Sequence, residues 1–153
     1  MQLDISNNHL CGLDEFGRGT YSAEGINAIA DALRVNASLT SLSMHSNKIG
    51  AVGGVAIADA LRVNASLTSC NVLKNNLDVP AAKALVEAVK DKDVSLCGIR
   101  PDETSTGSRF VAEDLKPPDA ILLASDLSKA GVSASMTEVL AFSKHVYSQT
   151  DKL

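Results

Sequence analysis

Two copies of one segment organise the chain. Residues 29–49 read IADALRVNASLTSLSMHSNKI and residues 57–77 read IADALRVNASLTSCNVLKNNL. The first thirteen residues of the two copies, 29–41 and 57–69, are identical and lie at an offset of 28. An internal copy at a period of about 20–50 residues indicates a repeat architecture. The fold must therefore be explained as a stack of similar units.

Each copy joins a helical pattern to a strand pattern. The helical half spaces its apolar residues along one face of a helix, at Ile29, Ala30 and Leu33 and again at Ile57, Ala58 and Leu61. The second half follows the spacing LxxLxL, whose last two members alternate as in a strand, at Leu39, Leu42 and Met44 and again at Leu67, Cys70 and Val72. An asparagine comes three residues later in both copies, and an apolar residue follows it.

The pattern LxxLxLxxNxL, with one helix per 28 residues, resembles the leucine-rich repeat. The helical half, with its IADAL, is similar to the long subtype found in ribonuclease inhibitor and in the sensor ends of NOD-like receptors. The resemblance implies an α/β fold, a right-handed horseshoe segment of a leucine-rich-repeat solenoid. Its parallel sheet would lie on the concave side and its helices on the convex side.

Partial matches extend the pattern over most of the chain. We expect parallel strands at residues 2–6, 40–45, 68–73 and 95–99, and helices near 23–35, 51–63 and 80–92. Residues 1–141 form the predicted repeat domain, with an irregular return at 100–108 and a strand at 107–111, and residues 142–153 form a C-terminal tail. Residues 11–20 are an insertion and are predicted as a turn-rich loop. A helix opened by Pro117 and Pro118 is expected to place Ala120, Leu123, Ala124 and Leu127 inward.

The repeated asparagines have a predicted structural role. An Asn side chain carries a donor and an acceptor, so inside a turn it can satisfy backbone groups that the bending chain leaves unpaired. This predicts an asparagine ladder of Asn8, Asn47 and Asn75. Asn36-Ala-Ser and Asn64-Ala-Ser fit the glycosylation acceptor pattern, but in the absence of an export signal we interpret them as helix-end turns.

Composition excludes several classes of partner. The 153 residues are 45% hydrophobic and 3% aromatic, so the core must be built from Leu, Ile, Val and Ala. A net charge of −4 with scattered Lys and Arg offers no footprint for nucleic acid or an anionic membrane. There is no secretory segment and no apolar run of about 20 residues, so we expect a cytoplasmic protein. Cys70 and Cys97 are expected to be reduced and buried at matching inward positions.

The sequence offers little reactive machinery. His9, His45 and His145 are far apart, and none has a His or Cys at metal-ligand spacing. Serines are abundant, but no GxSxG elbow is present. We therefore expect no enzyme activity, no metal and no cofactor.

The residues between the inward ones should face the other side of the sheet, in three columns. Leu96 falls in the first column beside Ser69, at an offset of 27. The third column contains His45, Leu73 and Arg100, with Lys74 beside them, and these four are the candidate partner-binding residues. The leading hypothesis is a protein–protein interaction module that binds a protein partner on its concave sheet. Two alternatives stay open at this point. Ran GTPase-activating proteins share the repeat type and activate an enzyme, and the chain could also be a fragment of a larger NOD-like-receptor-type protein.

Overall fold

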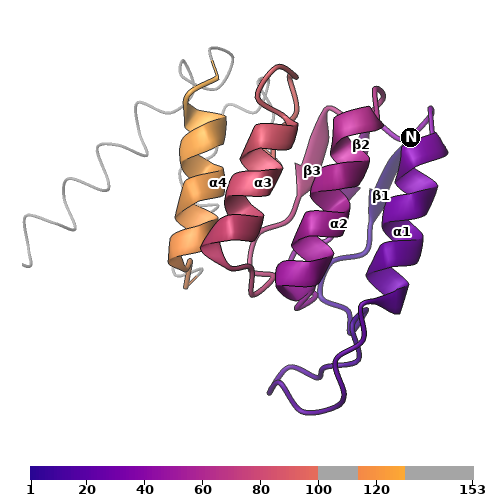
Figure 1. Ribbon diagram of the computed structural model, residues 1–153, viewed down its shortest axis with the longest axis vertical. Helices are drawn as coiled ribbons and strands as arrows, with labels where there is room; N and C mark the ends of the chain where they lie inside the picture. The colour runs from indigo at the N-terminus through magenta and orange to yellow at the C-terminus, as the bar shows by residue number, and fades with distance from the viewer. Residues whose placement is uncertain (100–113, 130–153) are drawn as a thin grey trace, which may run out of the picture.

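The computed structural model describes residues 1–99 and 114–129 (Figure 1). The predicted return at 100–108, the strand at 107–111, the tail at 142–153 and Arg100 lie outside the described residues. The described chain is mixed α/β, with the elements β1 (Gln2–Asp4), α1 (Glu24–Val35), β2 (Ser41–Ser43), α2 (Gly50–Val63), β3 (Ser69–Asn71), α3 (Val79–Ala88) and α4 (Pro117–Leu127).

The three strands form one parallel sheet in the order β1-β2-β3. Leu3 pairs with Leu42 and Leu42 with Cys70, so the inward position of each unit lies beside the same position of the next. The predicted parallel pairing is confirmed, although the strands are shorter than expected. The four helices lie side by side on one face of the sheet (Figure 1). A parallel strand pair needs such a crossover helix, and the 28-residue unit supplies one.

Small residues set how closely neighbouring units pack. Gly53 and Gly54 are buried in α2, although glycine lowers the helix propensity of that segment. A Cβ on Gly53 would lie 3.0 Å from Ile26 Cγ2 of α1, and one on Gly54 would lie 2.7 Å from Leu77 Cδ2. The two glycines therefore let α2 approach the units on both of its sides. The core between helices and sheet consists of Leu, Ile, Val, Ala, Met and Cys, without a buried aromatic residue among the described ones.

The fourth strand is reduced to a single parallel bridge, between Ser69 and Ser95. This is an offset of 26, whereas placing Leu96 beside Ser69 on the open face required an offset of 27, so that placement was wrong: Leu96 is fully buried. The chain turns immediately afterwards, with Gly98 at φ 72°. The Ser95 hydroxyl accepts a hydrogen bond from the Ile99 N–H at 2.9 Å across this turn.

The predicted inward face of the last helix was wrong in part. In α4 the buried residues are Asp119, Leu122 and Asp126. Ala120 and Ala124 are exposed, whereas Leu123 and Leu127 are partly buried and pack against the core, as predicted. The helix is rotated because its two buried carboxylates meet backbone N–H groups of the preceding units, described below. An apolar periodicity alone could not reveal this.

Candidate functional site

A groove of about 600 Å³ runs across the three strands on the face opposite the helices. We call it the sheet groove, and its strand residues include Gln2, Asp4, Ser41, Ser43, Ser69 and Asn71. These side chains alternate along the strands with core residues, so they leave the sheet on the side away from the helices. Most are short and polar. The groove is therefore a broad polar surface with little side-chain bulk.

Hydroxyl groups order one end of the sheet groove. Ser6 Oγ lies 2.6 Å from Ser43 Oγ and donates to Asp4 Oδ1, also at 2.6 Å. The Ser6 N–H donates to the same carboxylate oxygen at 2.9 Å. These bonds stabilise the charged form, and the Ser6 hydroxyl contributes most to holding the pKa of Asp4 below its ordinary value. This end of the groove therefore presents a carboxylate at neutral pH.

Three of the four predicted partner-binding residues line the sheet groove, namely His45, Leu73 and Lys74. His45 Nδ1 lies 2.7 Å from Ser46 Oγ, and the Lys74 N–H donates to Asp119 Oδ1 at 2.8 Å. Leu73 was predicted to be an exposed anchor, and this was wrong: only 5% of it is exposed, and it belongs to the core. The alternation of faces holds only within a strand, but β3 ends at Asn71 and the chain turns at Lys74, with φ 58°.

The three ladder asparagines lie in successive turns and bond from one turn to the next. Asn47 Nδ2 donates to Ile5 O at 2.9 Å and to Met44 O at 2.8 Å. Asn75 Nδ2 donates to Met44 O at 3.0 Å and to Val72 O at 2.9 Å. The backbone N–H of Asn8 donates to Asn47 Oδ1, and that of Asn47 to Asn75 Oδ1. Asn47 and Asn75 are buried, whereas Asn8 is exposed.

A second ladder runs along the C-terminal ends of the helices. Asn64 Nδ2 donates to Leu33 O at 2.7 Å and to Asn36 O at 3.0 Å, which links the ends of α1 and α2. One unit further on, at the same offset of 28, stands Lys92, whose ammonium donates to Leu61 O at 2.5 Å and to Asn64 O at 2.9 Å. Asn36 and Asn64 end helices, as predicted, but the role of Lys92 was missed. The sequence signal that could have revealed this role is the position of Lys92, which lies one repeat of 28 residues after Asn64.

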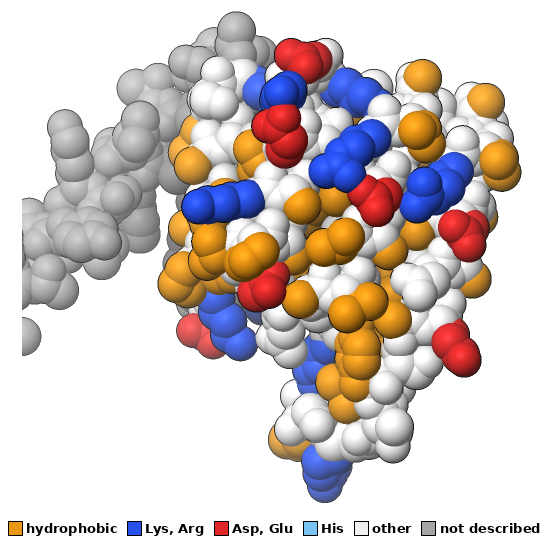
Figure 2. Space-filling model, viewed as in Figure 1, with side chains coloured by type: hydrophobic (Ala, Val, Ile, Leu, Met, Phe, Trp, Pro, Cys, Tyr) orange, Lys and Arg blue, Asp and Glu red, His pale blue; other side chains and the backbone are white. Residues whose placement is uncertain are grey.

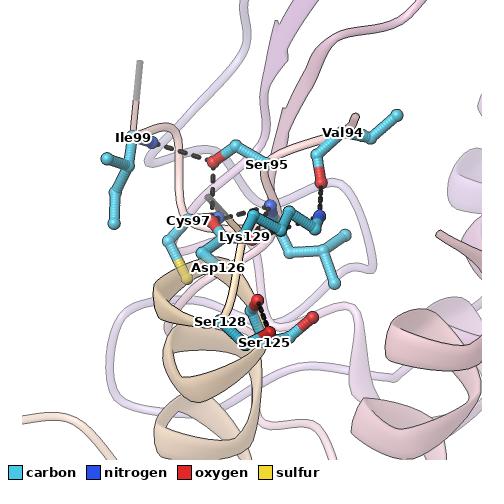
Figure 3. Close-up of polar contacts among 9 residues, drawn as sticks. Val94, Ser95, Cys97, Ile99, Ser125, Asp126, Ser128 and Lys129 are labelled. Atoms are coloured by element: carbon cyan, nitrogen blue, oxygen red, sulfur yellow. Dashed lines mark hydrogen bonds and ion pairs between the residues drawn. The ribbon is translucent and has the colours of Figure 1, made fainter. Parts of the chain in front are cut away.

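The carboxylates of α4 were also missed. Asp126 is fully buried, and its Oδ2 accepts from Ser95 Oγ at 2.7 Å, from the Leu96 N–H at 3.0 Å and from the Cys97 N–H at 2.9 Å (Figure 3). Lys129 Nζ lies 3.7 Å from the other carboxylate oxygen. Asp119 accepts from the N–H groups of Lys74 and Lys116. In this way α4 supplies acceptors to backbone donors where the regular units end.

The three described cysteines are buried thiols and not activated nucleophiles. Cys11, Cys70 and Cys97 are buried and free, as expected for Cys70 and Cys97. Burial raises the pKa of the Cys70 thiol to about 12. Burial also raises the pKa of Cys97 well above its ordinary value, and the nearby Asp126 raises it further. The described part of the chain has no group of three or more His, Cys, Asp or Glu placed to hold a metal ion.

Comparison with protein-family models and with curated proteins finds no match for this chain. Within residues 1–99 and 114–129, no helix combines the length and apolar character needed to cross a membrane.

Proposed function

We propose that this chain is a leucine-rich-repeat solenoid segment that binds a protein partner on the concave face of its sheet. Support for the solenoid comes from the 28-residue sequence repeat, the parallel strands in matched register and the two ladders of side-chain bonds. Each feature recurs from one unit to the next, as expected when units stack in one dimension.

The observation that carries the binding proposal is the sheet groove itself. Equivalent positions on adjacent strands repeat short polar side chains, with Ser41 beside Ser69 and Ser43 beside Asn71. Such a surface lets a partner approach the backbone closely over three strands. Its charges are separated, with Asp4 on β1 and Lys74 beyond β3. A partner with opposite charges in the reverse order would be oriented by them.

The revised binding residues are Asp4, Ser41, Ser43, His45, Asn71 and Lys74, in place of the buried Leu73 and of Arg100. Ser41 suits a blocking substitution because it is partly exposed, lies in a strand and lines the groove. Ser41→Trp adds bulk to the groove, and Trp is well tolerated in strands. The matched control is Val63→Trp, at the exposed end of α2 on the helical side.

The test compares partner capture by immobilised wild type, Ser41→Trp and Val63→Trp from an extract of the source cells. Thermal melts first establish that all three are folded. We expect Ser41→Trp to abolish capture of proteins that the wild type and Val63→Trp both retain. Equal capture by Ser41→Trp and wild type, with loss in Val63→Trp, would place binding on the helices and refute the concave-face proposal.

A further inference from the structure

Residues 11–20 form an ordered loop that projects from the fold between β1 and α1, and we call this segment the finger loop. In the next two units the chain passes from strand to helix directly, between Ser43 and Gly50 and between Asn71 and Val79, so the repeat does not require an insertion here. Figure 1 shows the finger loop extending beyond the ends of the helices, and Figure 2 shows a protrusion of the surface at the same place. A loop that the fold does not need, yet holds in one conformation, suggests a function.

The base of the finger loop is closed by two glycines. Leu13 and Gly19 form an antiparallel bridge. Gly12 has φ +76°, and a Cβ there would lie 2.4 Å from Thr20 O. Gly19 has φ +120°, and a Cβ there would lie 2.2 Å from Gly12 O. A side chain at either position would push the two arms of the loop apart, so glycine is required at both.

One carboxylate organises the outer end of the finger loop. Asp14 Oδ1 accepts from the backbone N–H groups of Phe16 at 2.9 Å and Arg18 at 2.8 Å. Asp14 Oδ2 accepts from Arg18 Nε at 2.8 Å. The loop is tied to the body because Lys48 Nζ donates to Asp14 O and the Tyr21 hydroxyl donates to Ile49 O at 2.6 Å. The conformation is therefore set before any partner arrives.

The conformation presents an aromatic ring and a guanidinium together. Phe16 is one of only three Phe residues in the chain, and 72% of it is exposed. The Arg18 guanidinium carbon lies 4.8 Å from the centroid of its ring, and 74% of the Arg18 side chain is exposed. Aromatic residues and Arg dominate binding hot spots, and a rigid presentation lowers the entropy lost on association.

We propose that the finger loop is a recognition element that inserts Phe16 into an apolar pocket on another protein and places Arg18 against a carboxylate at the pocket rim. A projecting ring fits a concave partner, and the exposed guanidinium can bond a carboxylate in two places. A membrane is disfavoured, because Asp14 and Glu15 immediately precede Phe16 and the net charge is −4. This inference goes beyond binding in the sheet groove and does not rest on it.

The test begins with photo-cross-linking from the full chain in an extract of the source cells. Benzoylphenylalanine replaces Phe16 in one variant and Val35 in the control, which is 85% exposed at the end of α1. We expect a discrete protein adduct from position 16 and none from position 35. A lipid adduct, an adduct of two copies of this chain, the same adducts from both positions or no adduct would overturn the proposal.

The protein recovered in the adduct is then purified and used as the probe. We expect its Kd for Phe16→Ala and for Arg18→Ala to rise about thirtyfold over wild type, as for hot-spot residues, with Val35→Ala unchanged. Gly19→Ala leaves both contact residues in place but opens the loop base, so it should also weaken binding. A Phe16→Ala Kd equal to that of wild type would refute the assignment. Ser41→Trp, which blocks the sheet groove, should leave the position-16 adduct intact, so the two proposals can fail separately.

A second measurement tests preorganisation in the isolated protein. The amides of Phe16 and Arg18 donate to Asp14, so their hydrogen exchange should be slower than in an unstructured peptide. Exchange of both amides at the unstructured rate would contradict a preformed recognition element.

Discussion

Of the three single Ala substitutions in the asparagine ladder, Asn75→Ala should destabilise the protein most. Asn75 is fully buried, and its amide bonds backbone groups of two units. The Asn47 N–H donates to Asn75 Oδ1 at 2.8 Å, and Val72 O accepts from Asn75 Nδ2 at 2.9 Å. Removing the side chain leaves this donor and this acceptor buried without those partners.

The magnitude follows from counting the groups that lose a partner. Met44 O also accepts from Asn47, and Leu73 O also accepts from the Ser46 N–H, so both keep a bond. The Asn47 N–H and Val72 O therefore carry most of the cost, and the Ile49 N–H, which loses a longer bond of 3.5 Å to Asn75 Oδ1, adds a smaller share. Each buried unsatisfied group costs roughly 1–3 kcal/mol, so Asn75→Ala should lower the free energy of unfolding by roughly 2–6 kcal/mol.

The other two ladder positions provide matched controls. Asn47→Ala removes bonds to Ile5 O and Met44 O, but these oxygens also accept from Asn8 and Asn75, so the expected loss is about 1–2 kcal/mol. Asn8 is exposed, and water can replace its bonds to Ile5 O and Ser6 O. Asn8→Ala should therefore cost under about 0.5 kcal/mol.

The assay is urea denaturation followed by circular dichroism, with the free energy of unfolding extrapolated to water. The expected order of destabilisation is Asn75, then Asn47, then Asn8. Equal losses at all three positions, or a larger loss for Asn8 than for Asn75, would show that burial and partner redundancy do not set the strength of this ladder.

Three further predictions concern other parts of the structure. Lys92→Met keeps the apolar stem of the side chain but removes the ammonium that donates to Leu61 O and Asn64 O. It should lower the free energy of unfolding by about 1–3 kcal/mol in the same urea assay. A change under about 0.5 kcal/mol would show that water can replace the ammonium. Cys70 should react with a thiol reagent only on unfolding, because burial raises its pKa to about 12 and leaves little thiolate at neutral pH, and rapid labelling of the native protein would contradict this. The pKa of Asp14 lies below its ordinary value of 3.8, chiefly because its carboxylate accepts from the Arg18 N–H. The hydrogen bonds to this carboxylate should therefore stabilise the finger loop fully above pH 3.8, and this stabilisation should be lost as the pH falls through the lowered pKa. Amide exchange at Phe16 and Arg18, corrected for the intrinsic pH dependence, should accelerate only on that acid side, and an onset near neutral pH would be contrary to this assignment.

Local patterns in the sequence carried most of the fold. A helix begins close to each predicted start, with α2 at Gly50 and α3 at Val79, where Asp78 accepts from the Ala81 N–H at 2.8 Å. The strands pair in parallel as predicted. These features follow from spacing alone, since two nearly identical segments adopt the same conformation and then lie beside each other. The same spacing put Asn47 and Asn75 in equivalent turns.

Stacking against neighbouring units decided the rest. Leu73 is buried because β3 has already ended at Asn71. Leu96 is buried because the last strand pairing has an offset of 26. Asp126 points inward because Ser95, Leu96 and Cys97 present donors to it from a distant part of the chain. The sequence by itself determined the repeating unit, because periodicity within a unit is a local property. Only the tertiary structure decided where the repetition ends and which polar groups serve those ends, because their partners lie about 30 residues away.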